Sequence, residues 1–290
     1  MVISQLNGGM GNQMFQYAAA KSLSLHHQVP LFIDDSKFKR DTISELEVDR
    51  KTEIFNFPAI RDSIAHPATL EMFSGKRKLL TKLLPRHRQI VYREPFYHFD
   101  KNFFHSRKTV YLQGAWQSYR YFEKYRTGIT PLFRLDPEYT SSVEYKADEI
   151  LAANSVSVHV RRNDYLRMQI ILEWHGIMSK EYYVAGLEEL TRQVGALHVY
   201  YFTDDPQWVS ENLMPLYPGQ LISSEVSANH YQDFYLMSRC HHNIIANSSF
   251  SWWAAYLNEF PGKKVIAPKR WFDQGPKDTQ DLIPPAWQRM

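Results

Sequence analysis

The sequence predicts an α/β fold with two Rossmann-like domains that face a cleft, and three features of the chain lead to this prediction. Short β-prone runs alternate with helical patterns in both halves, as expected for parallel sheets whose strands are joined by helices. A glycine-rich turn separates the first β-prone run from the first helical pattern. The length of 290 residues suffices for two domains of ordinary size.

The first domain is expected over residues 1–135 and begins with a βαβ unit. The unit consists of a β-prone run at 2–6, the turn GGMG at 8–11, a helical pattern over 12–27 and a second β-prone run, VPLFID, at 29–34. The stretch 36–110 is mixed and interrupted, so its pattern predicts no topology. Residues 111–122 then indicate a strand followed by the start of an aromatic helix.

The second domain is expected over 136–290, where strands and helices alternate as in a doubly wound sheet. The predicted strands are SVSVHV (155–160), LHVYYFT (197–203), QLIS (220–223), NIIAN (243–247) and KVIAP (264–268). The predicted helices span roughly 179–194, 206–214, 230–240 and 250–259. Ser179 and Ser249 are the expected N-caps of the first and the last of these helices.

Charge and cysteine content exclude several classes of protein. With 34 Lys and Arg against 31 Asp and Glu, the formal net charge is +3, which is too small to call for a nucleic-acid partner. Cys240 is the single cysteine, so an intrachain disulfide and a cysteine-based metal cluster are both excluded.

We expect a cytoplasmic protein. A single cysteine fits a reducing compartment, and the start of the chain lacks the pattern of a secretory signal. No apolar run approaches the ~18 residues of a membrane span. The basic, partly amphipathic segment 76–88 is a candidate for weak peripheral contact with the inner face of a membrane, the alternative being a solvated helix face.

The glycine turn at 8–11 is the first candidate binding element. Backbone N–H groups between a strand and a helix, together with the helix dipole, can receive an anion or a sugar hydroxyl. The turn half-matches a dinucleotide-binding fingerprint, with Asp34 near the position of a ribose-binding acid. Met14 stands where the third glycine belongs, which disfavours NAD. A tight turn without a ligand is the other alternative.

HVRRNDY at 159–165 gives a stronger signal. The alternation of SVSVHV leads directly into Arg161 and Arg162 at the carboxyl end of a predicted parallel strand, the edge at which open α/β sheets bind ligands. Arginine pairs bidentately with phosphate oxygens, so it can neutralise a diphosphate leaving group without a metal. Asp164 could orient an arginine or accept a proton from an acceptor hydroxyl. The alternative is a surface salt bridge between Arg162 and Asp164.

NSSFSWW at 247–253 follows another predicted strand and opens a helix. Hydroxyl groups stand there beside free helix N–H groups, which suits a second phosphate contact. The alternative is ordinary helix capping by Ser249 or Ser251. Trp252 and Trp253 begin the apolar face of the helix and are expected in the core.

TDDP at 203–206 ends the strand between these two motifs. The carboxylates of Asp204 and Asp205 could accept from guanine or from ribose hydroxyls, and Asp205 before Pro206 could instead cap the next helix. No D-x-D sequence occurs, and the histidines are scattered. A metal site is therefore not expected.

Five stretches in this order resemble the α-1,2-fucosyltransferase family, within the α-1,2/α-1,6/protein O-fucosyltransferase superfamily. They are GGMGNQMFQYAAA, WQSYRYF, HVRRNDY, YYFTDDP and IIANSSFSWWAAYLN, and they extend over nearly the whole chain. The combination is far more specific than any one motif. The length and the lack of a membrane anchor resemble bacterial members.

The resemblance implies a GT-B-like fold in which the second domain holds most of GDP-β-L-fucose. It further implies transfer of fucose, with inversion, to the 2-hydroxyl of a terminal β-galactose on an oligosaccharide, with no cofactor and no required metal. Two alternatives remain: a glycosyltransferase that uses another nucleotide sugar, and a catalytically idle module that binds a nucleotide or a glycan. The acceptor beyond the terminal galactose and the oligomeric state are not predicted.

The resemblance also assigns residues by their matching positions. Arg161 and Arg162 would face the diphosphate, and His159 the nucleotide. Asp204 or Asp205 would address guanine. The donor-binding residues of the second domain would be completed by Asn247, Ser248, Ser249 and Phe250, the last three enclosing the phosphates. The opposite wall would be formed by first-domain residues Asn7, Gly9, Gly11, Asn12 and Gln13.

The catalytic base is the least determined assignment. Inverting transfer requires a group that takes the proton of the acceptor hydroxyl. Asp164, the nearest carboxylate of the arginine motif, is the first choice and would act together with Arg162. Glu173 and His175 are the alternatives, and a dissociative path with a weak base is a further one.

Overall fold

The computed structural model describes residues 1–39, 50–95, 97–166 and 168–290, without the side chains of Lys76, Arg77, Asp164, Tyr165 and Ile171. Within these residues the chain forms two compact units. The first comprises Met1–Arg134 and Asp278–Ile283, and the second comprises Leu135–Lys277 and Pro284–Met290. Each unit contains a parallel sheet with helices, so the predicted α/β class is confirmed.

Segment 278–283 packs with the first unit, although the sequence placed all of 136–290 in the second domain. Hydrogen bonds explain this difference. The carboxylate of Asp281 accepts from the backbone N–H of Phe99 at 3.0 Å and pairs with the guanidinium of Arg120 at 3.2 Å. These contacts join residues that are far apart in the sequence, so the local sequence pattern does not predict them.

The first unit contains a sheet with the strand order β3-β2-β1-β5-β4, in which all neighbours are parallel. The described strands are β1 (Val2–Gln5), β2 (Leu31–Asp34), β3 (Ser63–Ile64), β4 (Val91–Arg93) and β5 (Val110–Gln113). The described α-helices are α1 (Met10–His27), α2 (Pro67–Glu71), α3 (Gly75–Thr81) and α4 (Arg126–Ile129). The stretch 36–110, for which the sequence predicted no topology, supplies β3 and β4 and the first residue of β5.

The predicted βαβ unit of the first domain is present as β1, α1 and β2. All four residues of β1 are buried, as expected for the central strand of a sheet covered on both faces. Apolar side chains of α1, among them Phe15 and Leu23, are fully buried, and Gln28 ends the helix in the left-handed conformation. The glycine turn is thereby fixed at the carboxyl end of the central strand.

The second unit contains a sheet with the order β11-β10-β9-β6-β7-β8, also parallel throughout its described pairs. The described strands are β6 (Ser155–Val160), β7 (His198–Thr203), β8 (Gly219–Leu221), β9 (His242–Ile244), β10 (Val265–Ala267) and β11 (Gln288–Arg289). The described α-helices are α5 (Pro137–Thr140), α6 (Glu144–Ala152), α7 (Asn163–Leu166), α8 (Gln169–His175), α9 (Lys180–Val194), α10 (Pro206–Asn212), α11 (His230–Arg239) and α12 (Ser249–Leu257).

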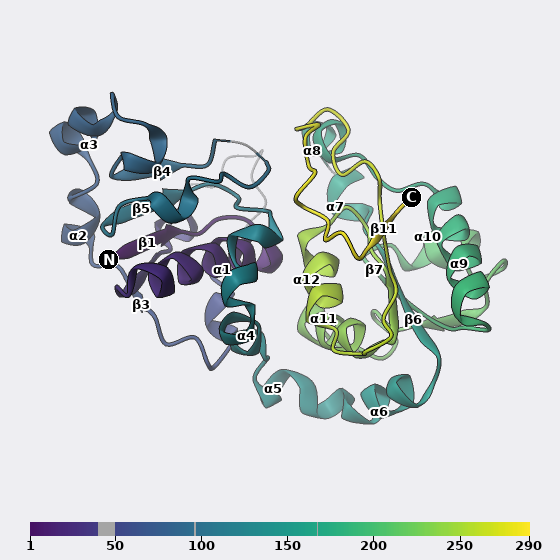
Figure 1. The fold of residues 1–290 in the computed structure, drawn as a ribbon. Coiled ribbons are helices and arrows are strands. Elements are labelled where there is room, and N and C mark those ends of the chain that lie inside the picture. The colour runs from purple at the N-terminus through teal and green to yellow at the C-terminus, as the bar shows by residue number, and fades with distance from the viewer. Residues whose placement is uncertain (40–49, 96, 167) are drawn as a thin grey trace. The chain divides into compact units, whose positions relative to one another are not determined.

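The chain order reverses in the middle of this second sheet. From β6 the chain proceeds through β7 to β8 on one side, then returns to β9, which pairs with β6 on the other side. Helices α9 and α10 lie on one face of the sheet, and α11 and α12 lie on the opposite face (Figure 1). In doubly wound folds, ligands bind outside the carboxyl ends of the strands at such a reversal. The topology therefore predicts a ligand site at the carboxyl ends of β6 and β9.

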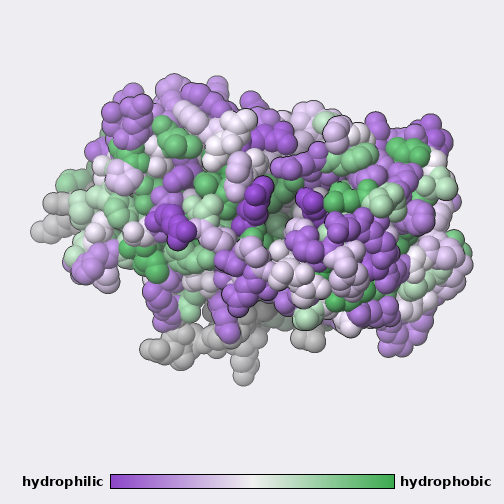
Figure 2. Space-filling model, turned by 90° about the horizontal axis from the view of Figure 1, so that it is seen from below, coloured by the Kyte–Doolittle hydropathy of each residue, from purple (hydrophilic) through white to green (hydrophobic). Residues whose placement is uncertain are grey.

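In the described part of the chain, no helix combines the length and the apolar character needed to cross a membrane. Figure 2 shows one face on which hydrophilic and hydrophobic residues are interspersed. Leu79, Leu80 and Leu83 of the basic segment 76–88 are strongly exposed.

Candidate functional site

The two motifs with the strongest sequence signals meet at the strand reversal of the second unit. Strands β6 and β9 pair in parallel, with Val158 opposite Ile244. Arg161 and Arg162 directly follow β6, and Asn247 and Ser248 lie a few residues beyond β9. Both loops thus begin at the same edge of the same sheet, as the sequence predicted.

The start of α12 is capped by Ser248, whose hydroxyl accepts from the N–H of Phe250 at 3.4 Å. The expectation that Ser249 is the N-cap was wrong by one position, because the backbone is already helical at Ser249. Ser248 is buried, and Ser249 and Phe250 are partly exposed at the first turn. The neighbouring Trp252 and Trp253 are fully buried, which confirms their predicted place in the core.

The side chains of Asp204 and Asp205 contact the paired arginines. The Nε atom of Arg161 lies 3.4 Å from Asp204, and that of Arg162 lies 3.2 Å from Asp205. Asp204 also accepts from the backbone N–H of Arg162 at 2.8 Å, and the Arg162 guanidinium lies over the ring of Trp208 at 4.3 Å. These contacts orient both guanidinium groups, since arginine presents its donors in a rigid plane.

Asp205 has a second structural role. Its carboxylate accepts from the N–H of Trp208 at 3.2 Å and so caps α10, which confirms the alternative reading of TDDP as a helix cap. Both carboxylates therefore already have hydrogen-bond and ion-pair partners within the unit. Recognition of guanine by Asp204 or Asp205 stays a prediction. The shared work of both residues is to hold Arg161 and Arg162 at the end of β6.

The three candidate bases have different surroundings. Asp164 lies in α7, but its side chain is outside the described part of the structure, so its role stays a prediction, and so does a salt bridge to Arg162. Glu173 is exposed and accepts from the side chain of Gln169 at 2.8 Å. Burial lowers the pKa of His175 to about 4, so this imidazole is neutral near pH 7.

His159, the last residue but one of β6, has only 5% of its surface exposed. Burial, and secondarily the charge of Arg161, lowers its pKa to about 3. Its Nδ1 is enclosed and has no hydrogen-bond partner among the described residues. The ring lies 5.8 Å from that of Phe250, which also contacts Phe234 at 5.4 Å. A neutral imidazole beside aromatic rings suits an uncharged planar group such as a nucleotide base.

Asp233, in the first turn of α11, was missed by the sequence analysis. Its carboxylate accepts from Ser223 at 2.7 Å and from Ser227, and Ser223 also accepts from the N–H of Thr203 at the end of β7. Burial raises the pKa of Asp233, and the two hydroxyl groups oppose this shift. The sequence signal that could have identified it is an acidic residue in the first turn of the predicted helix at 230–240, just after Asn229, a good N-cap residue.

Asn247 connects three segments of the second unit. It is 1% exposed, and its Nδ2 donates to the carbonyl oxygens of His175 at 2.9 Å, of Gly176 at 3.2 Å and of Trp271 at 3.2 Å. These bonds give the residue a structural role that the sequence did not predict. Its predicted contact with the donor stays a prediction.

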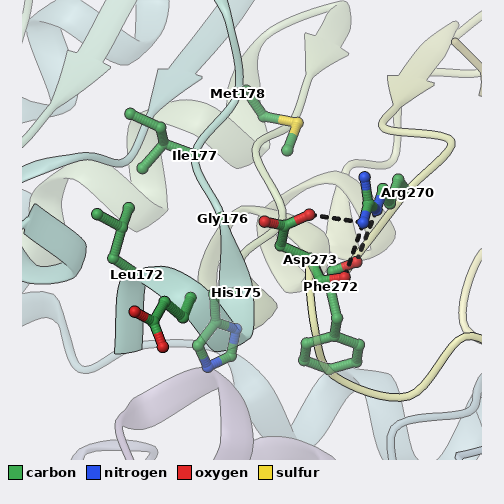
Figure 3. A pocket seen from close by; sticks show the side chains of 9 residues that line it. Leu172, His175, Gly176, Ile177, Met178, Arg270, Phe272 and Asp273 are labelled. Atoms are coloured by element: carbon green, nitrogen blue, oxygen red, sulfur yellow. Dashed lines mark hydrogen bonds and ion pairs between the residues drawn. The ribbon is translucent and has the colours of Figure 1, made fainter. Parts of the chain in front are cut away.

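The segments joined by Asn247 border a cavity of about 400 Å³ (Figure 3). Its lining combines apolar side chains such as Leu172 and Met178 with the charged side chains of Glu173, Arg270 and Asp273. Arg270 pairs with Asp273 at 2.6 Å. A cavity with a few polar groups among apolar ones is typical of a site for a small ligand.

The glycine turn of the first unit needs glycine for a steric reason. Gly8 has φ +74°, and a Cβ at this position would lie 2.5 Å from the side chain of Asn12. The next residue, Gly9, precedes α1 without a side-chain cap, and Gly11 is buried inside the first turn. The backbone of the turn therefore suits a polar ligand, whereas several of its side chains are engaged within the unit.

Gln13 is the clearest case of such engagement. Its amide donates to the carbonyls of Gly8 at 3.0 Å and Lys51 at 2.8 Å, and accepts from the N–H groups of Glu53 and Ile54. Nearby, the N–H of Asn7 donates to the side chain of Gln16 at 2.9 Å. Gln13 thus fixes segment 51–54 against the turn, and its predicted contact with the donor stays a prediction.

The dinucleotide alternative finds no support in the first unit. Asp34 accepts from the hydroxyl of Tyr111 at 2.5 Å and from the N–H of Ser36 at 3.0 Å, so both of its oxygens are engaged. Met14 is fully buried where a dinucleotide-binding turn has its third glycine. Among the described residues, no group of three or more His, Cys, Asp or Glu side chains is placed to hold a metal ion.

Comparison with known proteins identifies the family of the chain. Residues 69–290 match the sequence model of Glycosyl transferase family 11. The chain belongs to this family. The resemblance that the five motifs indicated is thereby confirmed, and this family 11 protein is a glycosyltransferase.

Two relatives from Escherichia coli match nearly the whole family 11 chain. The O-antigen biosynthesis glycosyltransferase WbnK is 31% identical over 93% of the chain and 94% of its own length. An alpha-1,2-colitosyltransferase is 31% identical over 100% of the chain and 99% of its own length. A galactoside alpha-(1,2)-fucosyltransferase 1 from Saimiri boliviensis boliviensis is 30% identical over 35% of the chain and 28% of its own length.

A solved structure supports the fold. The fucosyltransferase NodZ from Bradyrhizobium aligns with a TM-score of 0.50 and 16% identity, covering 88% of this chain and 92% of that one. The family 11 chain therefore has a GT-B-like fold of two Rossmann-like domains, as the resemblance implied.

Proposed function

We propose that this family 11 glycosyltransferase transfers L-fucose from GDP-β-L-fucose to the 2-hydroxyl of a terminal β-galactose, with inversion and without a required metal. The observation that carries the proposal is the pair of oriented arginines at the strand reversal, beside the start of α12. Relatives named for α-1,2 transfer support the linkage.

The paired arginines supply the chemistry that this reaction needs. When the bond between fucose and the diphosphate breaks, negative charge grows on a phosphate oxygen. Arg161 and Arg162 are held by Asp204 and Asp205, so they meet that charge without first reorganising. In our proposal the start of α12, from its N-cap Ser248 to Phe250, encloses the same phosphates.

We assign the nucleotide base to the surroundings of His159. Asp204 and Asp205 already form ion pairs with the arginines. In this proposal their main effect on the donor is to orient Arg161 and Arg162, and a contact with guanine is not their only role. The free Nδ1 of His159 and the adjacent ring of Phe250 are suited to a base at the end of β6.

A second donor is favoured by one specific observation, the 31% identity to an alpha-1,2-colitosyltransferase over the whole chain. Colitose is L-fucose without its 3-hydroxyl group, so GDP-colitose is the closest rival to GDP-fucose. A site built to bind a hydroxyl rejects the analogue that lacks it by a large factor, ~10⁴ or more, because its polar groups are left unpaired.

The test is a comparison of GDP-fucose with GDP-colitose on a panel of β-galactosides, with the product linkage determined by NMR and repeated in EDTA. We expect α-1,2-fucosyl products, undiminished by EDTA. We also expect GDP, and not UDP or NAD, to raise the melting temperature, since a ligand that binds only the folded state stabilises it. Faster transfer of colitose, another linkage or loss of activity in EDTA would each refute a stated part of the proposal.

Peripheral membrane contact and a cytoplasmic location also belong to this proposal. Leu79, Leu80 and Leu83 are 64%, 78% and 96% exposed, and Lys78 and Lys82 are exposed beside them. Apolar side chains flanked by basic ones favour an anionic membrane surface. We expect the double variant Leu80→Ser, Leu83→Ser to lose sedimentation with vesicles of anionic phospholipid while transfer to soluble acceptors is unchanged. Equal sedimentation of variant and wild type would refute the contact.

A further inference from the structure

The cavity of the second unit lies beside the proposed phosphate site. Its walls are formed by segment 172–178 and by segment 270–273, which follows β10. Asn247 donates to backbone carbonyl oxygens of both segments, and the next residue, Ser248, is the N-cap of α12. The cavity is therefore connected to the start of α12 by a single buried side chain, and all of these residues belong to the second unit.

The order of the strands places the cavity where a sugar would extend from the diphosphate. The strands follow one another as β10-β9-β6 along the sheet. In the proposed function the nucleotide base lies near His159 on β6, and the phosphates lie between Arg161 and the start of α12, which follows β9. The cavity is lined by the loop after β10, one strand further along. Because the carboxyl ends of parallel strands share one edge, the base, the diphosphate and the sugar would follow that edge in this order.

Backbone hydrogen bonds hold the two walls of the cavity together. The N–H of Asp273 donates to the carbonyl of Trp174 at 2.9 Å, and the N–H of Gln274 donates to that of Glu173 at 3.0 Å. Gly176 has φ +69°, and a Cβ at this position would lie 3.1 Å from the Cβ of Asp273, so a larger residue would crowd the opposite wall. The cavity is thus formed by the fold itself, as sites for small ligands usually are.

The two walls differ in polarity. Figure 3 shows Leu172, Ile177 and Met178 on one wall, with Arg270 and Asp273 on the other. Arg270 pairs with one carboxylate oxygen of Asp273 at 2.6 Å and donates to the backbone carbonyl of the same residue at 2.8 Å. The guanidinium thereby fixes the carboxylate at the wall of the cavity. The Asp273 side chain remains 47% exposed, so it is accessible to a ligand.

A 6-deoxy sugar matches both walls. Fucose carries a methyl group on one side of its ring, and this group is favourably buried against apolar side chains. The other ring positions carry hydroxyl groups, which donate strongly to a carboxylate. The cavity volume of about 400 Å³ lies within the range of sites for small ligands.

We propose that this cavity holds the sugar ring of the donor, with its methyl group against Ile177 and Met178 and a ring hydroxyl donating to Asp273. This inference rests on the proposed function and adds the residues that select the sugar. Met178 distinguishes a methyl group from a hydroxymethyl group, and Asp273 binds a hydroxyl that a more deoxygenated sugar lacks.

The methyl contact is tested with GDP-L-galactose, whose sugar is fucose with a hydroxyl group on C6. An apolar pocket rejects an analogue that adds a hydroxyl by only about 10²-fold. We expect the wild-type kcat/KM to favour GDP-fucose by about this factor. Met178→Gln, which keeps the length of the side chain, should reduce the preference to about tenfold or less. The Kd for GDP, which lacks the sugar, should stay within about twofold of wild type.

Met214→Gln is the matched control, because Met178 and Met214 both pack, partly buried, against the same core cluster of the second unit. The control should keep the wild-type preference even if it is less stable, since loss of folded enzyme lowers the rates with both donors equally. A wild-type preference in Met178→Gln would overturn the methyl contact.

Asp273→Ala tests the hydroxyl contact without disturbing the core. We expect kcat/KM for GDP-fucose to fall about 10–100-fold, as for loss of a hydrogen bond to a charged group, while the Kd for GDP and the melting temperature stay close to wild type. Glu189→Ala is the control, because it removes the carboxylate of another ion pair of the same unit, with Arg192 at 2.7 Å, and it should transfer normally.

Two results with Asp273→Ala would overturn the inference. Unchanged kcat/KM for GDP-fucose would place the sugar outside this cavity. A change confined to KM for the galactoside would place the acceptor there instead of the donor sugar. A wild-type enzyme that transfers nothing from GDP-fucose would contradict the proposed function itself.

Discussion

Replacing Arg162 by alanine is expected to lower kcat/KM for transfer by about 10²–10³-fold or more, with little change in the melting temperature. The Arg162 side chain is only 15% exposed, and its guanidinium lies on the ring of Trp208 and is paired with Asp205. In the proposed site it meets the charge that develops on the diphosphate. Loss of one such preorganised donor costs about 3–4 kcal/mol of transition-state stabilisation.

Arg162→Lys tests whether charge alone is sufficient. Lysine keeps the positive charge but loses the planar fork that pairs with two phosphate oxygens and stacks on Trp208. We therefore expect the lysine variant to recover only a small part of the lost activity. Arg192→Ala is the matched control, since Arg192 is an exposed arginine of the same unit, paired with Glu189. Transfer and GDP affinity within threefold of wild type in Arg162→Ala would place the donor elsewhere.

The second sheet was predictable because its signals are local. Alternation of apolar residues predicted a strand at 155–160, and β6 has those bounds. The predicted helix at 179–194 corresponds to α9, and Ser179 is its N-cap, accepting from the N–H of Tyr182. Alternating strands and helices predict a parallel doubly wound sheet, and ligands of such sheets bind at the carboxyl ends of strands. The ends of β6 and β9 could therefore be proposed as the site before any contact between distant residues was known.

The features that escaped prediction depend on contacts between distant residues. Strands β3 and β4 contain two and three residues, too few to show a period. No local sequence pattern marks Glu94, because the N–H groups that donate to its carboxylate belong to Ala115 and Trp116, which are distant in the sequence. The ion pairs of Asp204 and Asp205 with the arginines likewise join segments some forty residues apart.

Asn247→Asp should destabilise the second unit by about 3 kcal/mol or more and lower its melting temperature by roughly 10 °C. The Nδ2 of Asn247 donates to three carbonyl oxygens in a place that solvent does not reach. A carboxylate there would face those oxygens with a negative charge and no donor. The three carbonyl oxygens would lose this donor, and the new charge would add a desolvation cost.

The pH dependence of the variant identifies the cause. Burial and the facing carbonyls would raise the pKa of the new carboxyl, so the deficit should be large at pH 7 and shrink as the group protonates on acidification. Asn212→Asp is the control, because Asn212 donates one bond, to the carbonyl of Trp208, and its replacement should cost less than about 1 kcal/mol. If Asn247→Asp instead kept its melting temperature and lost only GDP-fucose affinity, Asn247 would touch the donor directly, as the sequence predicted. The two outcomes separate a side chain that builds the site from one that binds within it.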